Sequence, residues 1–415
     1  VYSWFRAQYG IREETIERLK IGYAEDGSPT AARLLMDGPG AFTPRELTAT
    51  SAFRPTAQDG IVPFFDRRIV FPYWSRGHVV FLIGRRTPWT LDHEWEKSKY
   101  KKLAVRNDRN HSHVAACIRN DVLYNEDVLL TGPERIVITE GVTDCISLIE
   151  KGFAAVSPVT VQIREADWDR LISKLAGVKT VYICQDNEVS EAGLHGAMKT
   201  ARRLAGHGIT TRVAVLPLGE KQIAARSRLA ELSAESPEAD TLRADAKIDV
   251  NEYFASGKTA ADFEAILAAA QTPLEMAIAK LQPDVQGLAK LLDPILAEVH
   301  QLEPIEQPRY LKLIQEKCGK GRLPISALRQ QMKVVRIDGA RGGKGRRPGA
   351  QALRAVNAGV TSWRNDLLLN LNGTVKPVLA NAITALRGAP EWSGALAYNE
   401  FANCTVLRKP APWMK

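Results

Sequence analysis

The middle of the chain is organised by two short apolar runs that each break at a carboxylate and lead into a helical pattern. Residues 135–139 form a β-rich run that ends at Glu140, and helical spacing continues through Ile149. Residues 180–184 form a second run that leads to Asp186, and a helix is expected from about residue 194 to 205. The order of strand, acid and helix, repeated twice, predicts an α/β fold in which helices flank a parallel sheet.

Apolar spacing also predicts what lies on either side of this α/β unit. Residues 68–74 and 79–86 are apolar runs joined by a glycine turn, which predicts a hairpin in a basic α+β N-terminal subdomain. Residues 211–217 are expected to form one more strand, and residues 260–335 have helical spacing. We therefore expect a C-terminal helical region after the sheet.

These patterns divide the chain into five segments and indicate a fragment of a larger protein. The chain begins with Val1 rather than Met, and Lys415 lies in the middle of what looks like a domain. The expected segments are the basic N-terminal subdomain at residues 1–128, the α/β catalytic domain at 129–256, a helical bundle at 257–336, a basic glycine-rich linker at 337–360 and the start of a further domain at 361–415.

The carboxylates that follow the two strands predict a metal site. Because the carboxyl ends of parallel strands share one edge of a sheet, Glu140, Asp186 and Glu188 are expected to converge there. Like charges this close repel, so the cluster is tolerable mainly when a cation neutralises it. Hard oxygen ligands favour Mg²⁺ or Mn²⁺. The prediction requires Glu140 to lie near Asp186, with no lysine filling the space between them.

At these residues the sequence resembles the Toprim domain of primases, topoisomerases and related nucleases. The Glu-Gly-x-x-Asp motif of that family matches Glu140, Gly141 and Asp144. Its Asp-x-Asp motif appears at residues 186–188, with Glu188 in place of the second Asp. The longer carboxylate can still bind a metal, although its reach differs.

A third acidic segment of the primase branch resembles residues 247–254. Asp249 matches an acid of that segment, whereas Asn251 replaces one. The resemblance implies catalytic roles for Glu140, Asp186 and Glu188, binding of Mg²⁺ or Mn²⁺ by these three and Asp249, and supporting roles for Gly141, Asp144 and Glu252. Glu140 would act either as the base or as a ligand of a second metal ion.

Charge and aromatic residues favour a nucleic-acid partner. The chain has 56 Lys and Arg against 47 Asp and Glu, and its formal charge of +9 favours a polyanion. Residues 97–119 are basic, with Tyr100 among the cations, which is typical of a track for single-stranded nucleic acid but also of a solvated loop. The candidate nucleic-acid or nucleotide-binding residues are Arg68, Arg85, Lys99, Lys101, Lys102 and Lys199.

The five cysteines form no C-x-x-C pair, and neither a signal peptide nor a long apolar span is evident. We therefore expect a cytoplasmic protein without a membrane partner.

The resemblance implies a DNA primase that joins nucleoside triphosphates on a single-stranded DNA template. The spacing between residues 186 and 197 looks more like primases of phages and mobile elements. Residues 361–415 resemble the opening of the virulence-associated protein E family, which implies a helicase domain in cis, with a helicase in trans as the other possibility. Two alternatives stay open, namely a Toprim-type nuclease and a non-catalytic DNA-binding adaptor with a degenerate Toprim fold.

Overall fold

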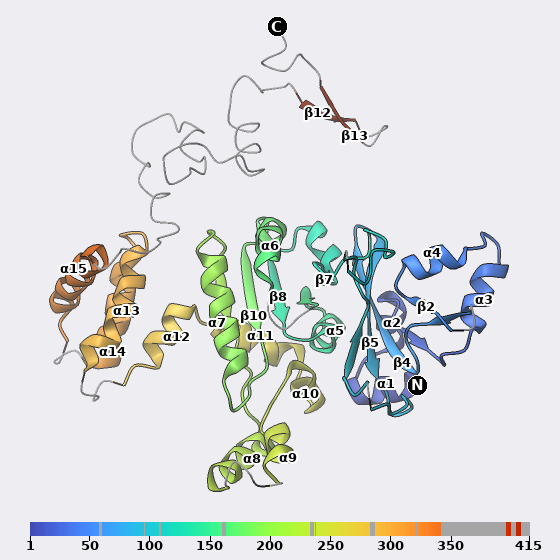
Figure 1. The fold of residues 1–415 in the computed structure, drawn as a ribbon. Helices are drawn as coiled ribbons and strands as arrows, with labels where there is room; N and C mark the ends of the chain where they lie inside the picture. Colours follow the sequence, from blue (N-terminus) through green and yellow to red (C-terminus); the bar gives the residue numbers. More distant parts are fainter. Residues whose placement is uncertain are drawn as a thin grey trace. The chain divides into compact units, whose positions relative to one another are not determined.

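The computed structural model divides into two compact units, Val1–Arg329 and Gln330–Lys415 (Figure 1). The residues that it describes are 1–57, 60–94, 96–107, 109–159, 163–232, 236, 238–282, 287–319, 323–341, 396–399 and 404–407.

A five-stranded sheet forms the centre of the first unit, and its strand order is β11-β10-β8-β9-β7. The strands β11, β10, β8 and β9 run parallel, whereas the short β7 pairs antiparallel with β9. The bounds are β7 Leu123–Tyr124, β8 Arg135–Thr139, β9 Ala155–Pro158, β10 Thr180–Cys184 and β11 Thr211–Val213. The predicted α/β class is confirmed, but the last predicted strand is shorter than expected and ends at Val213.

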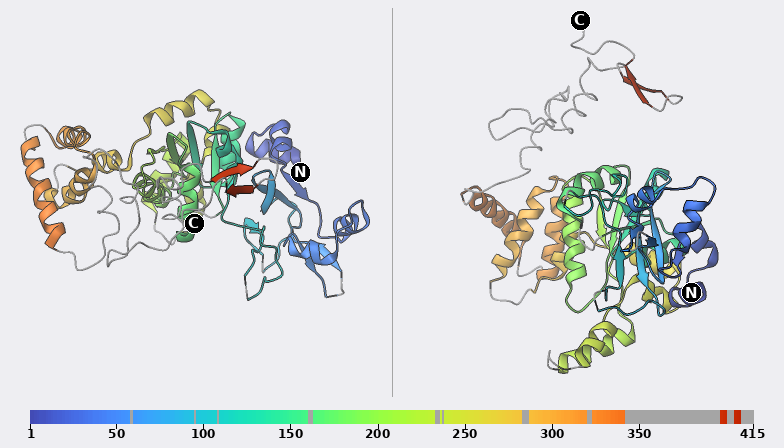
Figure 2. Two further views of the ribbon diagram at one scale, coloured as in Figure 1. Left: turned by 90° about the horizontal axis from the view of Figure 1, so that it is seen from above. Right: turned by 45° about the vertical axis from the view of Figure 1, so that its right-hand side comes forward.

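Helices cover both faces of this sheet, as the alternation of apolar residues along the strands requires. Ile136 and Ile138 of β8 pack with α6 (Trp168–Leu175) and α7 (Ala192–Ala205). Val137, between them, packs on the other face with α5 (Val142–Glu150), α10 (Val250–Ala255) and α11 (Ala260–Ala269) (Figures 1 and 2). The result is a three-layer arrangement that leaves the carboxyl ends of β8 and β10 as a shared edge.

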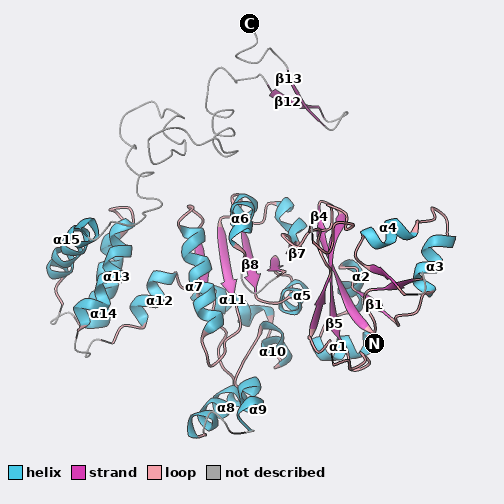
Figure 3. Cartoon of the chain, viewed as in Figure 1, coloured by secondary structure: helices cyan, strands magenta, loops and turns pink. Residues whose placement is uncertain are grey.

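The N-terminal part contains a four-stranded antiparallel sheet in the order β1-β4-β5-β6 (Figure 3). The predicted hairpin is confirmed as β4 and β5, which pair along their lengths with one irregularity at Tyr73/Trp74. The bounds are β1 Gly22–Ala24, β4 Arg68–Ser75, β5 His78–Arg86 and β6 Tyr100–Lys102, with α1 Tyr2–Tyr9, α2 Glu13–Arg18, α3 Thr30–Asp37, α4 Pro44–Ala49 and the small β2 (Phe53–Pro55) and β3 (Ile61–Pro63) pair around them.

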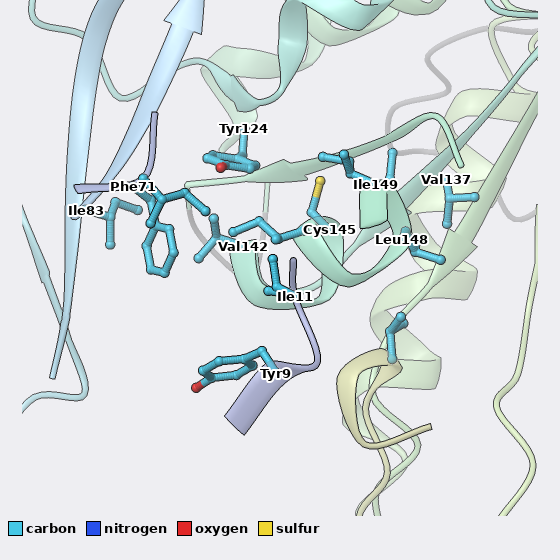
Figure 4. Close-up of a cluster of buried hydrophobic side chains, with 14 of the residues drawn as sticks. Tyr9, Ile11, Phe71, Ile83, Tyr124, Val137, Val142, Cys145, Leu148 and Ile149 are labelled. Carbon is cyan, nitrogen blue, oxygen red and sulfur yellow. The ribbon is translucent and has the colours of Figure 1, made fainter. Parts of the chain in front are cut away.

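One apolar core joins this antiparallel sheet to the parallel one. Figure 4 shows Phe71 and Ile83 of the hairpin beside Val142 and Cys145 of α5, with Tyr124 of β7 next to them. Because α5 begins directly after Glu140, this packing fixes the first acidic motif against the N-terminal sheet.

The remaining helices confirm the predicted C-terminal helical region. An inserted hairpin of α8 (Glu220–Glu231) and α9 (Glu238–Asp245) projects from the sheet domain (Figures 1 and 2). The later helices are α12 Pro273–Ala279, α13 Leu288–Gln301, α14 Gln307–Cys318 and α15 Ile325–Arg341, and two short 3-10 helices lie at Glu126–Thr131 and Glu165–Asp167.

The second unit is described only in part. Most of the expected linker at residues 337–360 and of the expected further domain at 361–415 lies outside the described residues. The antiparallel strands β12 (Leu396–Asn399) and β13 (Cys404–Leu407) are described there. In the described part of the chain, no helix is both long enough and apolar enough to cross a bilayer.

Candidate active site

Glu140 and Asp186 meet at the carboxyl edge of the parallel sheet. Thr139, at the end of β8, is in register with Cys184, at the end of β10, so the two acids follow neighbouring strands. The carbonyl oxygen of Asp186 and Glu140 Oε2 both lie beside Gly193, at 2.6 Å and 3.5 Å from the position that a Cβ atom would take there. The predicted convergence of these two residues is therefore present in the structure.

Burial and mutual repulsion make these acids harder to ionise. Burial raises the pKa of Glu140, and the negative charges of Asp186 and Glu188 add to the effect. Burial also raises the pKa of Asp186, with contributions from Asp249 and Glu188, while Lys247 opposes the shift. Four acids from three segments thus share one electrostatic environment, which is the arrangement expected of a cation-binding site.

Lys247 lies in this acidic cluster, contrary to the sequence-based condition that no lysine would stand there. Its ammonium group forms an ion pair with Asp186. Burial opposes its charge, but the hydrogen bond to Asp186 and the charges of Asp186, Glu140 and Asp249 outweigh burial and raise the pKa of Lys247. Lys247 is visible in the sequence as the first residue of the third motif, two residues before Asp249, but no role was expected for it.

Asp144 and Asn251 connect the first and third acidic segments. Asp144 is only 5% exposed, and burial, followed by the charges of Asp249 and Asp186, raises its pKa well above the usual range. The backbone N–H of Asn251 donates to Asp144 over 3.4 Å. The amide side chain of Asn251 donates to the carbonyl of Tyr9 (3.2 Å) and to Ser147 Oγ (3.1 Å). Asn251 therefore ties α10 to α5 and α1.

Asp249 has a structural and an electrostatic role. As the N-cap of α10, it accepts a hydrogen bond of 2.7 Å from the backbone N–H of Glu252. Its charge also acts on Asp144, Asp186 and Lys247. Burial raises the pKa of Glu252, helped by the charge of Asp249. The cap accordingly places the carboxylate of Glu252 near Asp249 and Lys247, at the edge of the acidic cluster.

Two glycines allow the close approach of chain segments around these acids. A Cβ atom at Gly193, in the first turn of α7, would lie 2.6 Å from the carbonyl oxygen of Asp186 and 3.5 Å from Glu140 Oε2. A Cβ atom at Gly141 would lie 2.7 Å from Asp144 Oδ2. Only a residue without a side chain fits at either position unless the neighbouring atoms move.

A cluster of cations and aromatic rings from the N-terminal part approaches the acids. Arg85 lies over the rings of Tyr9 and Tyr100, at 4.9 Å and 5.4 Å from their centroids, and donates to the Tyr100 hydroxyl over 2.7 Å. The Tyr100 hydroxyl is 3.4 Å from Thr143 Oγ1, beside Asp144. The Tyr9 hydroxyl is buried and has no hydrogen-bond partner within the described part of the chain. Sequence reasoning missed Tyr9, because no local pattern links it to a site more than a hundred residues away.

Lys99 belongs to the same region. Partial burial and the charges of Arg85 and Lys247 lower its pKa, while Asp249 and Asp144 oppose the shift. Among the six predicted cations, Lys99 therefore interacts with the charges of Asp144 and Asp249, and Arg85 lies within electrostatic reach of Lys99.

The other four predicted cations have different positions. Arg68 is 1% exposed and forms a 2.8 Å ion pair with Glu96, so its burial removes it from any nucleic-acid surface. Lys101 also pairs with Glu96, at 2.9 Å, and Lys102 donates to the carbonyl of Val159 over 2.7 Å. Lys199 is exposed on α7, where its charge reaches Glu165, a residue already hydrogen-bonded to Arg203.

The carboxylate oxygens of Glu140 and Asp186 suit Mg²⁺ or Mn²⁺ better than a metal ion that is coordinated by protein side chains alone. Among the described residues, no three His, Cys, Asp or Glu side chains form a ready-made cage. Mg²⁺ usually keeps several waters and binds one or two carboxylates together with substrate phosphates. Glu140 and Asp186 supply such a pair of carboxylates.

Comparison with known proteins agrees with this geometry. Residues 137–226 match the family model described as Toprim-like. The DNA primase of Geobacillus stearothermophilus is 28% identical over 216 residues, which cover 51% of this chain and 32% of the primase. The chain thus spans about a third of the length of that curated relative.

Solved primase structures share the fold. The zinc-binding and RNA polymerase domains of the Aquifex aeolicus primase match with a TM-score of 0.54 at 17% identity, over 79% of this chain and 68% of that one. The RNA polymerase domain of the Mycobacterium tuberculosis primase, solved with a double-stranded DNA oligomer that has a 6-nucleotide overhang, matches with a TM-score of 0.55 at 17% identity, over 77% and 90%. The chain therefore contains a Toprim domain, is homologous to a bacterial DNA primase, and has the fold of primase catalytic cores.

Proposed function

We propose that this chain synthesises short oligonucleotide primers on single-stranded DNA. The observation that carries the proposal is the meeting of Glu140 and Asp186 at one sheet edge, with Lys99 of the N-terminal part within electrostatic reach of Asp144 and Asp249. Homology with a DNA primase supports the same reaction, and DNA bound to a structure of similar fold supports the choice of template.

The protein residues divide the work of nucleotidyl transfer. Glu140 and Asp186 would hold Mg²⁺ or Mn²⁺, with Glu188 and Asp249 adding negative charge around the site. When bound, the divalent ion supplies the positive charge that neutralises the triphosphate and acidifies the attacking 3′ hydroxyl. Glu140 is also the candidate base for that hydroxyl, and burial, with the charges of Asp186 and Glu188, raises its pKa above the ordinary value.

The cations position the anionic substrates. Lys99 and Arg85 would bind triphosphate or template phosphates, because both lie beside Tyr100 and, within the described residues, neither forms an ion pair with a carboxylate. Lys247 would leave Asp186 when a divalent ion binds there, since its flexible stem is partly exposed.

A primer-synthesis assay tests the proposal. Single-stranded DNA is incubated with labelled NTPs, or dNTPs in parallel, and with Mg²⁺ or Mn²⁺, and products are resolved on a denaturing gel. Asp186→Asn is expected to lower synthesis at least about 100-fold, because it removes a carboxylate from the metal site. Glu165→Gln is the matched control and should retain activity, because Glu165 is an exposed carboxylate that pairs with Arg203. Nicking without synthesis would favour the nuclease instead.

A DNA-binding adaptor is a second candidate, favoured by the ion pair between Lys247 and Asp186. In an adaptor, the lysine would be the permanent counter-ion of the acids. Titration with Mn²⁺ followed by electron paramagnetic resonance separates the two functions, because an adaptor would bind no Mn²⁺ at this site.

We further propose a phage or mobile-element primase-helicase as the parent protein. The spacing from Asp186 to Ala197 and the resemblance of residues 361–415 to the virulence-associated protein E family support it. A helicase domain would then follow in cis, or a separate helicase would act in trans. Purification of the full-length parent protein and an assay of DNA-stimulated ATP hydrolysis would test this context.

A further inference from the structure

Asn187, between the two acids of the second motif, sets the register of the site. Its backbone pairs with Ile248 in an isolated antiparallel bridge, with N–H···O distances of 3.0 Å and 3.1 Å. Side chains alternate across a paired strand, so the neighbours of Asn187 and Ile248 share one face. Asp186 and Glu188 therefore lie on the same side as Lys247 and Asp249.

Arg226, from the inserted helix α8, holds the same bridge from the side. Its Nη2 donates to the Asn187 carbonyl over 3.1 Å and to Asn187 Oδ1 over 2.9 Å. Its Nε donates to the carbonyl of Ala246 over 3.0 Å. One guanidinium group thus joins both segments that carry the charged residues of the site.

The second half of the Asn187 side chain completes the attachment. Its Nδ2 donates to the carbonyl of Leu216 over 2.8 Å, just beyond β11. Asn187 thereby connects the sheet to the hairpin through its amide group, and none of its polar atoms is left to face the acids.

The α8–α9 hairpin has few other links to the sheet domain. Lys221 of α8 pairs with Asp245 of α9 at 2.7 Å, which closes the hairpin on itself. Ala225 is buried, whereas Ile223 is 53% exposed. Among the described residues of the hairpin, Arg226 is accordingly the one that hydrogen-bonds to the acidic segments.

We propose that Arg226 is a positioning residue that fixes the Asp186–Glu188 segment against the Lys247–Asp249 segment. The inserted hairpin is then part of the active-site scaffold. The inference rests on the proposed function, because it assigns the positioned carboxylates to metal binding. A displacement of about 1 Å at such a site can cost on the order of 100-fold in rate.

The test compares Mn²⁺ affinity among variants of the full chain, without DNA or nucleotide, by electron paramagnetic resonance. Arg226→Ala is expected to weaken Mn²⁺ binding about tenfold, and Arg226→Lys, which can reach fewer of the three acceptors, should give an intermediate value. Arg228→Ala is the matched control, because Arg228 lies on the same helix and pairs with exposed Glu231 and Glu238. Its Mn²⁺ affinity should equal that of the wild type.

Amide hydrogen exchange provides a readout independent of metal. The Asn187 and Ile248 amides should exchange faster in Arg226→Ala than in the wild type, with no change in Arg228→Ala. Unchanged Mn²⁺ affinity together with unchanged exchange would overturn the proposal. A lower melting temperature with normal Mn²⁺ affinity of the folded protein would do the same, because it would show a purely structural role.

Two further outcomes of these experiments have defined consequences. If Arg226→Ala does not fold, Arg226→Gln, which retains the stem and one donor group, takes its place in both measurements. If the wild type binds Mn²⁺ no better than Asp186→Ala, the proposed function fails, and the exchange rates of Asn187 and Ile248 alone decide whether Arg226 holds the bridge.

Discussion

Gly193 shows how little space surrounds the paired acids. Replacing it with alanine would place a methyl group 2.6 Å from the Asp186 carbonyl oxygen. We expect Gly193→Ala to reduce primer synthesis at least about tenfold and to lower stability by about 1–3 kcal/mol, because the two segments must move apart. Urea unfolding and the primer assay measure the two effects.

Gly206→Ala is the control for this change. Gly206 ends the same helix with a φ of −61°, and a Cβ atom there would lie 3.4 Å from its nearest neighbour. Both activity and stability should stay near the wild-type values. Equal behaviour of the two alanine variants would show that the close approach at Gly193 does not matter.

The buried carboxyl group of Asp144 should make the stability of the protein depend on pH. Its pKa is raised by burial and by Asp249 and Asp186, so its contribution to stability is present at low pH and is lost as the pH rises through the folded-state pKa. Asparagine does not titrate. In the presence of EDTA, the stability of Asp144→Asn relative to the wild type should therefore increase between about pH 4 and pH 8. Urea unfolding across this range measures the difference, and a constant difference would contradict the shifted pKa.

Single residues also show which contacts of the site could be predicted from the sequence and which could not. The motif positions of Glu140 and Asp186 followed from strands that end in acids, and the structure places them together. The burial of Arg68 could not be predicted from the sequence, because its partner Glu96 is 28 residues away and no local pattern indicates the ion pair. Lys247 was visible in its motif, but only the fold brings it to Asp186.

The strand β6 and the residue before it carry cations with different surroundings. Lys99 lies near the acids, whereas the ammonium of Lys102 is bound to the carbonyl of Val159. We expect Lys99→Met to raise the KM for NTP about 10- to 150-fold, since one charge-assisted hydrogen bond to phosphate is worth about 1.5–3 kcal/mol. Lys102→Met should leave the KM unchanged. Steady-state primer synthesis measures both, and equal KM values for the two variants would exclude a direct role of Lys99.

Elements were easier to predict than their contacts. The hairpin of β4 and β5, the strands β8 and β10 and the later helices follow from apolar spacing, which is a local property. The docking of α8 through Arg226 depends on the pairing of Asn187 with Ile248, residues that are distant in sequence. No local pattern in the sequence links this hairpin to residues 187 and 246, so the contact could be found only in the fold.

At the scale of the molecule, the shared core makes the parallel sheet dependent on the N-terminal part. Val142 and Cys145 of α5 pack against Phe71 and Ile83 of the antiparallel sheet (Figure 4). A fragment of residues 129–329 would expose this surface to water, at about 25 cal/mol for each Å² of apolar area. We expect it to aggregate or unfold, whereas residues 1–329 should unfold cooperatively. Size-exclusion chromatography and circular dichroism distinguish the outcomes, and a monomeric, folded shorter fragment would contradict the expectation.

The ion pair of Lys247 with Asp186 gives the protein an internal substitute for an inorganic ion. We therefore expect the fold to tolerate the removal of divalent ions, because the ammonium group of Lys247 offsets part of the negative charge of the acids. A metal ion that binds at Asp186 would displace the ammonium group of Lys247. A bound triphosphate would offer this group a new ion pair. We therefore expect bound metal to increase the affinity of the site for nucleotide, and bound nucleotide to increase its affinity for metal.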